Sequence, residues 1–203
     1  DSSIRTKADY WANSTDFDAQ TRQEISEILK QGNDKEITDR FYRNLEFGTG
    51  GLRGIMGAGT ARMNIYNIRR ASHAVASYVR SQTDSPSIAI SFDSRNNSKE
   101  FAIAAAEVFA HVGFQVYLTE QMRPVPMLSF MTRFFHCSAG ICVTASHNPK
   151  SYNGLKIVLD DVTLYGDAIQ KIYHDVEKVE EIPFERRGNL KNENDILSYY
   201  ISE

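Results

Sequence analysis

The chain has 203 residues, of which 41% are hydrophobic and 24% are charged, and its formal net charge is −3. This length and composition predict a folded globular protein with one substantial core, and they exclude an intrinsically disordered chain. The slight acidic excess also argues against a nucleic-acid partner, because a surface that follows a phosphate backbone normally carries a clear basic excess.

The sequence likewise gives no sign of a secreted or membrane protein. Its two cysteines, Cys137 and Cys142, are too few for a disulfide framework, and no Cys/His spacing is typical of a zinc site. No apolar run is long enough to span a bilayer, and the N-terminus lacks the apolar core of a signal peptide. We therefore expect a cytoplasmic protein with no membrane partner.

Taken in chain order, the predicted elements begin with two helices, over residues 16–31 and 34–43, in which apolar residues recur at helical spacing. The local composition then changes, because six of the 12 glycines lie between Gly48 and Gly59. This clustering predicts a pair of specialised loops. Beyond it the predicted helices cover 64–82, 98–112, 124–135 and 166–179, and the predicted strands cover 87–92, 114–119, 139–145 and 155–160. Ser98 is the expected N-cap of its helix and Gly113 the expected stop.

The alternation of strands with longer helices predicts an α/β domain of three layers, in which a mixed, largely parallel sheet lies between helices. The strands on either side of 146–154 are close enough to be antiparallel. We expect residues 1–45 to form a helical segment that packs on the domain, 46–182 to form the domain, and 183–203 to be a linker or the start of another domain.

The sharpest chemical signal is TASHNP (144–149), which follows a predicted buried strand. Ligands in open α/β sheets gather at the carboxyl ends of strands, so Ser146 stands where chemistry usually occurs. A phosphoserine would need cationic partners, and Lys156, His147 and Arg53 are available. The alternative is that Ser146 is an ordinary turn residue. A serine hydrolase is excluded, because the chain has no G-x-S-x-G motif.

The second signal is FGTGGLRG (47–54), which brings four glycines and Arg53 together. Glycines let backbone amides approach an anion closely, and arginine adds a forked cationic donor, so a phosphate neighbour is chemically sensible. The segment is neither a P-loop nor a dinucleotide-binding fingerprint, because it lacks GK[ST] and its third glycine is out of register. Its plain alternative is a structural bend with an exposed arginine.

Together the two segments, with YNGLKI (152–157) and DSR (93–95), resemble the ordered signatures of the α-D-phosphohexomutases, and GIMGAGTARMNIYNI (54–68) is similar to bacterial members in particular. The resemblance covers residues 31–179. It implies an isomerase domain that interconverts hexose 1-phosphate and hexose 6-phosphate through a phosphoserine and a hexose 1,6-bisphosphate. Its substrates are sugar phosphates, and its other partners are the remaining domains of the same polypeptide.

The resemblance also implies roles for individual residues. Ser146 would donate and accept the phosphoryl group and, through its phosphate, be a ligand of Mg²⁺. Lys156 and His147 are similar to residues that transfer protons and stabilise charge, and Arg53 is similar to the arginine that steadies the phosphate. Thr49, Gly50, Gly51, Arg53 and Asn148 are the expected phosphate-binding residues.

Some family segments are absent from these residues, notably the aspartate-rich loop that supplies the other Mg²⁺ ligands and the loop that reads the sugar. We therefore expect this chain to be inactive alone. A phosphopentomutase or a phosphoglucosamine mutase stays open as an alternative, as does a non-catalytic binding module of the same fold. A phosphatase is disfavoured, because no second acid or metal cluster accompanies the serine.

Overall fold

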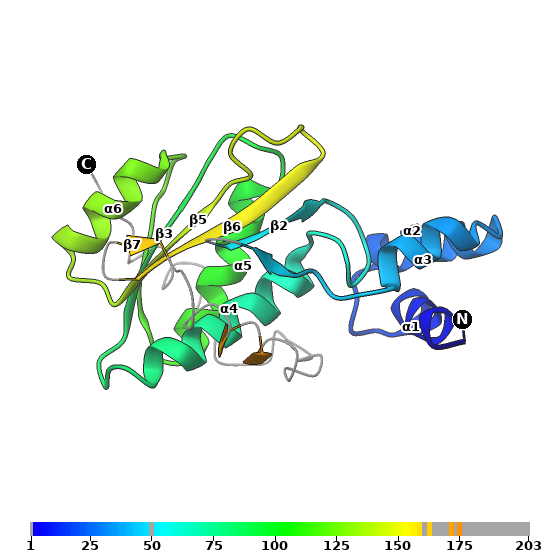
Figure 1. Ribbon diagram of the computed structural model, residues 1–203, viewed down its shortest axis with the longest axis horizontal. Coiled ribbons are helices and arrows are strands. Elements are labelled where there is room, and N and C mark those ends of the chain that lie inside the picture. Colours follow the sequence, from blue (N-terminus) through cyan, green and yellow to red (C-terminus); the bar gives the residue numbers. More distant parts are fainter. Residues whose placement is uncertain (1, 49–50, 160–161, 164–170, 173, 176–203) are drawn as a thin grey trace.

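The computed structural model describes residues 2–48, 51–159, 162–163, 171–172 and 174–175 (Figure 1). Its helices are α1 (Ser2–Asn13), α2 (Ala19–Lys30), α3 (Asp34–Phe41), α4 (Ile65–Arg80), α5 (Ser98–His111) and α6 (Val125–Phe134). Its strands are β1 (Phe47–Gly48), β2 (Gly51–Ile55), β3 (Ser87–Phe92), β4 (Gln115–Leu118), β5 (Ala139–Val143), β6 (Tyr152–Leu159) and β7 (Val162–Thr163). None of the described helices combines the length and apolar character needed to cross a bilayer.

The strands form one mixed sheet in the order β1-β2-β6-β5-β3-β4, with β7 also paired to β6. Strand β3 runs parallel to β4 and to β5, whereas β5 with β6, β2 with β6 and β1 with β2 are antiparallel pairs. The mixed α/β sheet is confirmed, and so is the antiparallel pair on either side of the Ser146 segment. Parallel pairing is less extensive than we expected, because the glycine-rich segment adds antiparallel strands at one edge.

Helices cover both faces of the sheet, as the three-layer prediction requires (Figure 1). Helices α4 and α5 pack on one face, in a core that includes Val75, Phe109 and Ile141. Helix α6 packs on the other face, where Leu128 contacts the smaller cluster that contains Cys142. Because the strands alternate their side chains between these two cores, the ends of β3 and β5 are fixed from both sides.

The N-terminal helices have a separate small core built around Trp11, Phe17, Ile25 and Phe41. Two hydrogen bonds join this core to the sheet domain. The Tyr66 hydroxyl, on α4, donates to Asp18 Oδ2 at 2.7 Å and accepts from the Asp18 amide at 2.7 Å. The two predicted helices correspond to α2 and α3. Helix α1 was not among the predicted elements.

Two local predictions are wrong. The glycine-rich segment is not a pair of loops, because residues 51–55 form strand β2 against β6. Ser98 is not the N-cap of α5, since Asn97 precedes it with a left-handed φ of 62° and the Ser98 hydroxyl instead donates to Asp93 Oδ1 at 2.7 Å. The helix predicted over 166–179 falls largely outside the described residues, and the segment 183–203 does so entirely.

Candidate active site

Ser146 lies just beyond the carboxyl end of β5 and its side chain is exposed. Its backbone has a φ of 55°, a left-handed conformation that is uncommon for a residue with a Cβ atom. The Ser146 amide donates to Thr144 Oγ1 at 3.0 Å, and the Asn148 amide donates to the Ala145 carbonyl at 3.1 Å. These bonds close a tight turn that presents the hydroxyl to solvent.

His147 is the nearest titratable neighbour of the serine. Its Nδ1 lies 3.3 Å from Ser146 Oγ, and both side chains are exposed. When Nδ1 carries no hydrogen, it can accept the hydroxyl proton, and when it is protonated, it can donate to the oxygen. The pair therefore has the geometry for proton exchange at Oγ.

Arg53 and Lys156 project from the same face of the sheet. In the antiparallel pairing of β2 with β6, Arg53 lies opposite Gly154. Lys156 lies two residues after Gly154 on β6, opposite Gly51, and residues two apart on a strand share a face. Arg53 is exposed and donates from Nη1 to Asn148 Oδ1 at 3.4 Å. Among the described residues, no hydrogen bond or ion pair joins Lys156 to the serine.

Lys156 is half-buried beside Cys142, its cross-strand partner on β5. Burial raises the pKa of the Cys142 thiol, as does the negative charge of Asp93, and the neighbouring Ser91 side chain and the positive charge of Lys156 partly offset that rise. The thiol is therefore a packing group under the lysine and carries no charge near neutral pH.

The glycine-rich segment contributes packing as well as donors. A Cβ atom on Gly51 would lie 2.0 Å from the carbonyl oxygen of Leu155, so only glycine allows β2 to pair with β6 here. Thr49 and Gly50, the other two predicted phosphate-binding residues of this segment, lie outside the described residues.

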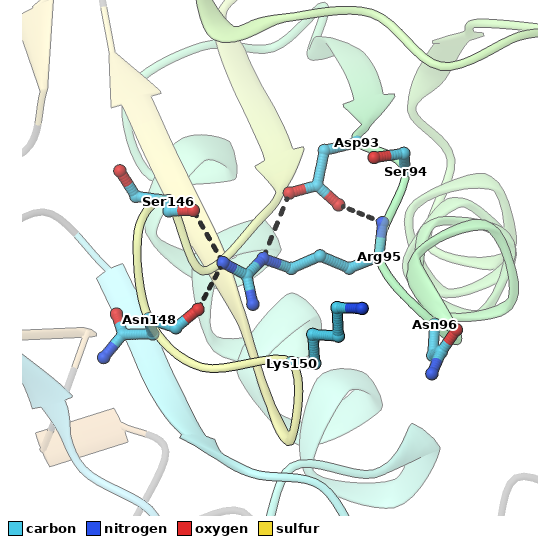
Figure 2. A pocket seen from close by; sticks show the side chains of 7 residues that line it. All are labelled: Asp93, Ser94, Arg95, Asn96, Ser146, Asn148 and Lys150. Atoms are coloured by element: carbon cyan, nitrogen blue, oxygen red, sulfur yellow. Dashed lines mark hydrogen bonds and ion pairs between the residues drawn. The ribbon is translucent and has the colours of Figure 1, made fainter.

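A cavity of about 470 Å³ opens beside the serine, between the carboxyl ends of β3 and β5 (Figure 2). Its lining residues are Asp93, Ser94, Arg95, Asn96, Ser146, Asn148 and Lys150. Sequence reasoning assigned no role to residues 93–96, which directly follow β3. The position of DSR (93–95) after a buried strand is nevertheless a usable signal for a site. Arg53, His147 and Lys156 do not line this cavity.

Arg95 crosses the cavity from the end of β3 to the serine loop, the segment 146–152, and bonds its backbone (Figure 2). Its side chain is only 15% exposed, and its Nε lies 3.5 Å from Asp93 Oδ2. Lys150 adds a further positive charge, so the cavity is locally basic although the whole chain has a net charge of −3.

The fold and these residues agree with a comparison to known protein families. Residues 44–183 match the model of the phosphoglucomutase/phosphomannomutase alpha/beta/alpha domain I. The chain belongs to this family. A phosphoglucomutase from Staphylococcus haemolyticus is 44% identical over 117 residues, which are 58% of this chain and 21% of that protein. A phosphoglucomutase from Staphylococcus aureus strain USA300 is 39% identical over 156 residues, which are 76% of this chain and 28% of that protein.

Solved structures of this phosphohexomutase family share the fold. A protein of Thermus thermophilus provisionally designated a phosphomannomutase superposes with a TM-score of 0.61 at 26% identity, over 66% of this chain and 30% of its own. The present chain thus spans between a fifth and a third of the length of these relatives.

The family implies Mg²⁺, and the chain's own residues fit such an ion only in part. The exposed Ser146 oxygen could carry a phosphate that faces a metal. Among the described residues, however, no three His, Cys, Asp or Glu side chains are grouped closely enough to hold an ion. The donor set in the described part of the chain is therefore incomplete for Mg²⁺, which prefers six oxygen ligands.

Proposed function

We propose that this chain is the phosphoryl-carrying domain of a phosphoglucomutase-type enzyme and that Ser146 is the residue that carries the phosphoryl group. The observation that supports this most strongly is the placement of Ser146. Its exposed hydroxyl stands at the carboxyl end of β5, in a tight turn beside a basic cavity, within a domain of the phosphohexomutase family.

The proposed reaction has two phosphoryl transfers. In the first, the bond between Oγ of phosphorylated Ser146 and phosphorus breaks, a sugar hydroxyl oxygen bonds to that phosphorus, and the hydroxyl proton passes to a base. The product is a hexose 1,6-bisphosphate. In the second, Oγ attacks the other phosphorus and the sugar oxygen leaves with a proton, so the serine ends as it began.

The residues around Ser146 suit the needs of these steps. His147 Nδ1, at 3.3 Å from Oγ, is the candidate to exchange the proton of the serine hydroxyl. Arg53, exposed on β2 and loosely bonded to Asn148, retains N–H donors for a phosphate. Lys156 is the proposed second cation, on the same face of the sheet as Arg53. Gly51 and Asn148, with Thr49 and Gly50, are proposed to complete the phosphate site.

Other parts of the enzyme must complete the proposed activity. Mg²⁺ bound through the phosphate of Ser146 would neutralise charge on the phosphoryl group. Its remaining ligands would come from other domains of the polypeptide, so we expect the 203-residue chain to lack mutase activity alone. A hexose phosphate is the proposed substrate, and ribose and glucosamine phosphates remain alternatives. We place the whole enzyme in the cytoplasm.

The proposed domain limits set the N-terminal helices apart as a segment packed on the domain. Residues 1–45 would form that segment, since α1 to α3 share a small core to which Ala58 and Tyr66 of the domain also contribute. Residues 46–182 would form the phosphohexomutase domain and 183–203 the passage to the next one.

The full-length enzyme provides the test of the phosphoserine. Incubation with hexose 1,6-bisphosphate should add one phosphoryl mass to the wild-type protein, and peptide mapping should place it on Ser146. Ser146→Ala should remove this adduct and lower the mutase rate by more than about 10³-fold, because no other oxygen stands in its place. Ser151→Ala, which changes an exposed serine of the same loop, is the matched control and should retain both.

A non-catalytic binding module is the second candidate, and the same experiment separates it from the enzyme. A module would bind the bisphosphate without acquiring the adduct, and Ser146→Ala would leave binding unchanged. Phosphorylation elsewhere on the chain, with normal turnover by Ser146→Ala, would contradict the proposed function.

A further inference from the structure

The left-handed turn at Ser146 needs an external support. With a φ of 55°, the residue is held in a conformation that its Cβ atom disfavours, and the side chain is exposed, so packing does not hold it. The hydrogen bonds within the turn fix amides, but they leave several carbonyl oxygens of the serine loop pointing inward. These oxygens all meet one side chain, that of Arg95.

The guanidinium of Arg95 donates to four backbone carbonyls of the serine loop. Nη2 bonds the carbonyl of Ser146 at 2.6 Å and that of Asn148 at 2.7 Å. Nη1 bonds the carbonyl of Pro149 at 2.9 Å and that of Tyr152 at 3.3 Å. One planar group thereby fixes both ends and the middle of the loop, and Figure 2 shows its bonds to Ser146 and Asn148.

These contacts occupy the donors of both terminal nitrogens. Arginine carries five N–H bonds, two on each terminal nitrogen and one on Nε. The four terminal ones match the four carbonyls, and Nε lies 3.5 Å from Asp93 Oδ2 in an ion pair. No donor of the terminal nitrogens is left to bind a substrate phosphate. A lysine could not replace the group, because its ammonium is a single point with three donors.

Arg95 is itself held in place by a chain of partly buried contacts. Asp93 Oδ1 accepts the Arg95 amide at 2.9 Å and the Ser98 hydroxyl at 2.7 Å. Asn153, fully buried at the start of β6, donates to Ser98 Oγ at 3.0 Å. The support therefore runs from the end of β3 to the start of β6, around the loop that carries the serine.

We propose that Arg95 is the positioning residue that holds Ser146 in its left-handed turn and thereby aims its hydroxyl at the transferred phosphoryl group. The inference rests on the proposed function of Ser146. Arg95 acts through the loop backbone and does not touch the phosphate, so its loss should misplace the nucleophile while leaving substrate binding nearly intact.

The test compares Arg95→Ala and Arg95→Lys in the full-length enzyme, with kcat, KM for the hexose 1-phosphate and the rate of Ser146 phosphorylation by hexose 1,6-bisphosphate as readouts. Both variants should lower kcat and the phosphorylation rate about 100-fold, the cost expected from moving a reacting group by about 1 Å. KM should change less than about threefold. Amide exchange should accelerate over the segment 146–152. If Arg95→Ala does not fold, Arg95→Lys carries the test.

Arg80→Ala is the matched control, because Arg80 also donates to a backbone carbonyl, that of Val112 at 2.6 Å, but takes no part in the site. It should leave kcat and phosphorylation unchanged. Added guanidinium ion should restore part of kcat in Arg95→Ala and none in Ser146→Ala.

Three results would overturn the inference. A wild-type kcat in Arg95→Lys would show that charge alone suffices, and a wild-type kcat in Arg95→Ala would show that no support is needed. A rise in KM at constant kcat would make Arg95 a phosphate ligand. Ser146→Ala separates these failures from a failure of the proposed function, because an active Ser146→Ala variant contradicts the phosphoserine whatever the Arg95 variants do.

Discussion

The serine loop is approached by an arginine from each side, and the two differ in almost every respect. On the side of β3, Arg95 is 15% exposed and bonds four loop carbonyls. On the side of β2, Arg53 is exposed and has a single 3.4 Å contact with Asn148. An arginine whose terminal donors are all used by protein carbonyls fixes a structure, whereas one with free terminal donors is available to a ligand.

This difference divides the surroundings of Ser146 into two sides. The fixed side consists of Arg95 with Asp93 and Asn153, and the open side is that of Arg53. Substitutions on the fixed side should lower the free energy of unfolding, and substitutions on the open side should change phosphate chemistry alone. Denaturant unfolding of the 203-residue chain tests that division.

Of the four substitutions considered, the one at Gly154, where the two sides meet, should have the largest effect. A Cβ atom there would lie 2.5 Å from the Leu52 carbonyl oxygen, 2.8 Å from that of Thr144 and 2.8 Å from Arg53 Cγ. Gly154→Ala must therefore push β6 away from its neighbours, and we expect it to lower the free energy of unfolding by about 3 kcal/mol. Gly48→Ala is the control, since the nearest atom to its new Cβ would be 4.0 Å away. Equal stability of the two variants would contradict the close approach at Gly154.

Asn153, on the fixed side, should be the next most sensitive. Its side chain is fully buried, donates to Asn96 O and Ser98 Oγ at 3.0 Å each, and accepts from the Gly154 amide at 2.8 Å. Asn153→Ala removes all three bonds and leaves buried partners unsatisfied, so we expect a loss of about 2 kcal/mol. Asn13→Ala removes an exposed asparagine and should cost less than about 0.5 kcal/mol. A similar loss in both would mean that the buried network carries no stability.

The fixed side is also the part of the site that the sequence predicted least well. Strand β3 (Ser87–Phe92) was predicted with its observed limits, because its apolar run is short, is bounded by turn residues and contains β-branched and aromatic side chains. The place of Arg95 directly after that strand is a signal for a role at the site, but it does not identify the partners of the side chain. Its partners are backbone carbonyls of residues more than fifty positions away, and backbone carbonyls are the same in every sequence.

On the open side, sequence-based prediction is limited for a different reason. Ser146 and Arg53 were recognised from their motifs, and the structure brings them to the same loop through Asn148. The glycine-rich segment was nevertheless predicted as loops, because glycine has low intrinsic strand propensity. Residues 51–55 form a strand only because β6, about a hundred residues later, supplies their hydrogen-bond partners. Helix α1 was missed although Ile4, Ala8 and Trp11 recur at the helical spacing i, i+4 and i+7 and pack in the N-terminal core.

Asp93→Asn isolates the charge on the fixed side. Asparagine keeps an oxygen that can accept from the Arg95 amide and from Ser98, but it places an uncharged NH₂ group opposite Arg95 Nε. We expect a loss of about 1 kcal/mol, since Asp93 is 24% exposed and solvent screens part of the interaction. Asp84→Asn, at an exposed turn, should leave unfolding unchanged. A stability equal to that of wild type for both variants would show that the hydrogen bonds of Asp93, and not its charge, hold Arg95.

Arg53→Ala should have the smallest effect on unfolding and still impair the enzyme. Because the Arg53 side chain is exposed and its one contact is long, its removal should change the free energy of unfolding by less than about 0.5 kcal/mol. In the full-length enzyme the same variant should slow Ser146 phosphorylation by hexose 1,6-bisphosphate about tenfold or more, because a forked donor to the phosphate is lost. Arg53→Lys should fall between Ala and wild type in this rate, since it keeps the charge and loses the fork. A stability loss as large as that of Asp93→Asn, with an unchanged phosphorylation rate, would place Arg53 on the fixed side and remove the distinction between the two arginines.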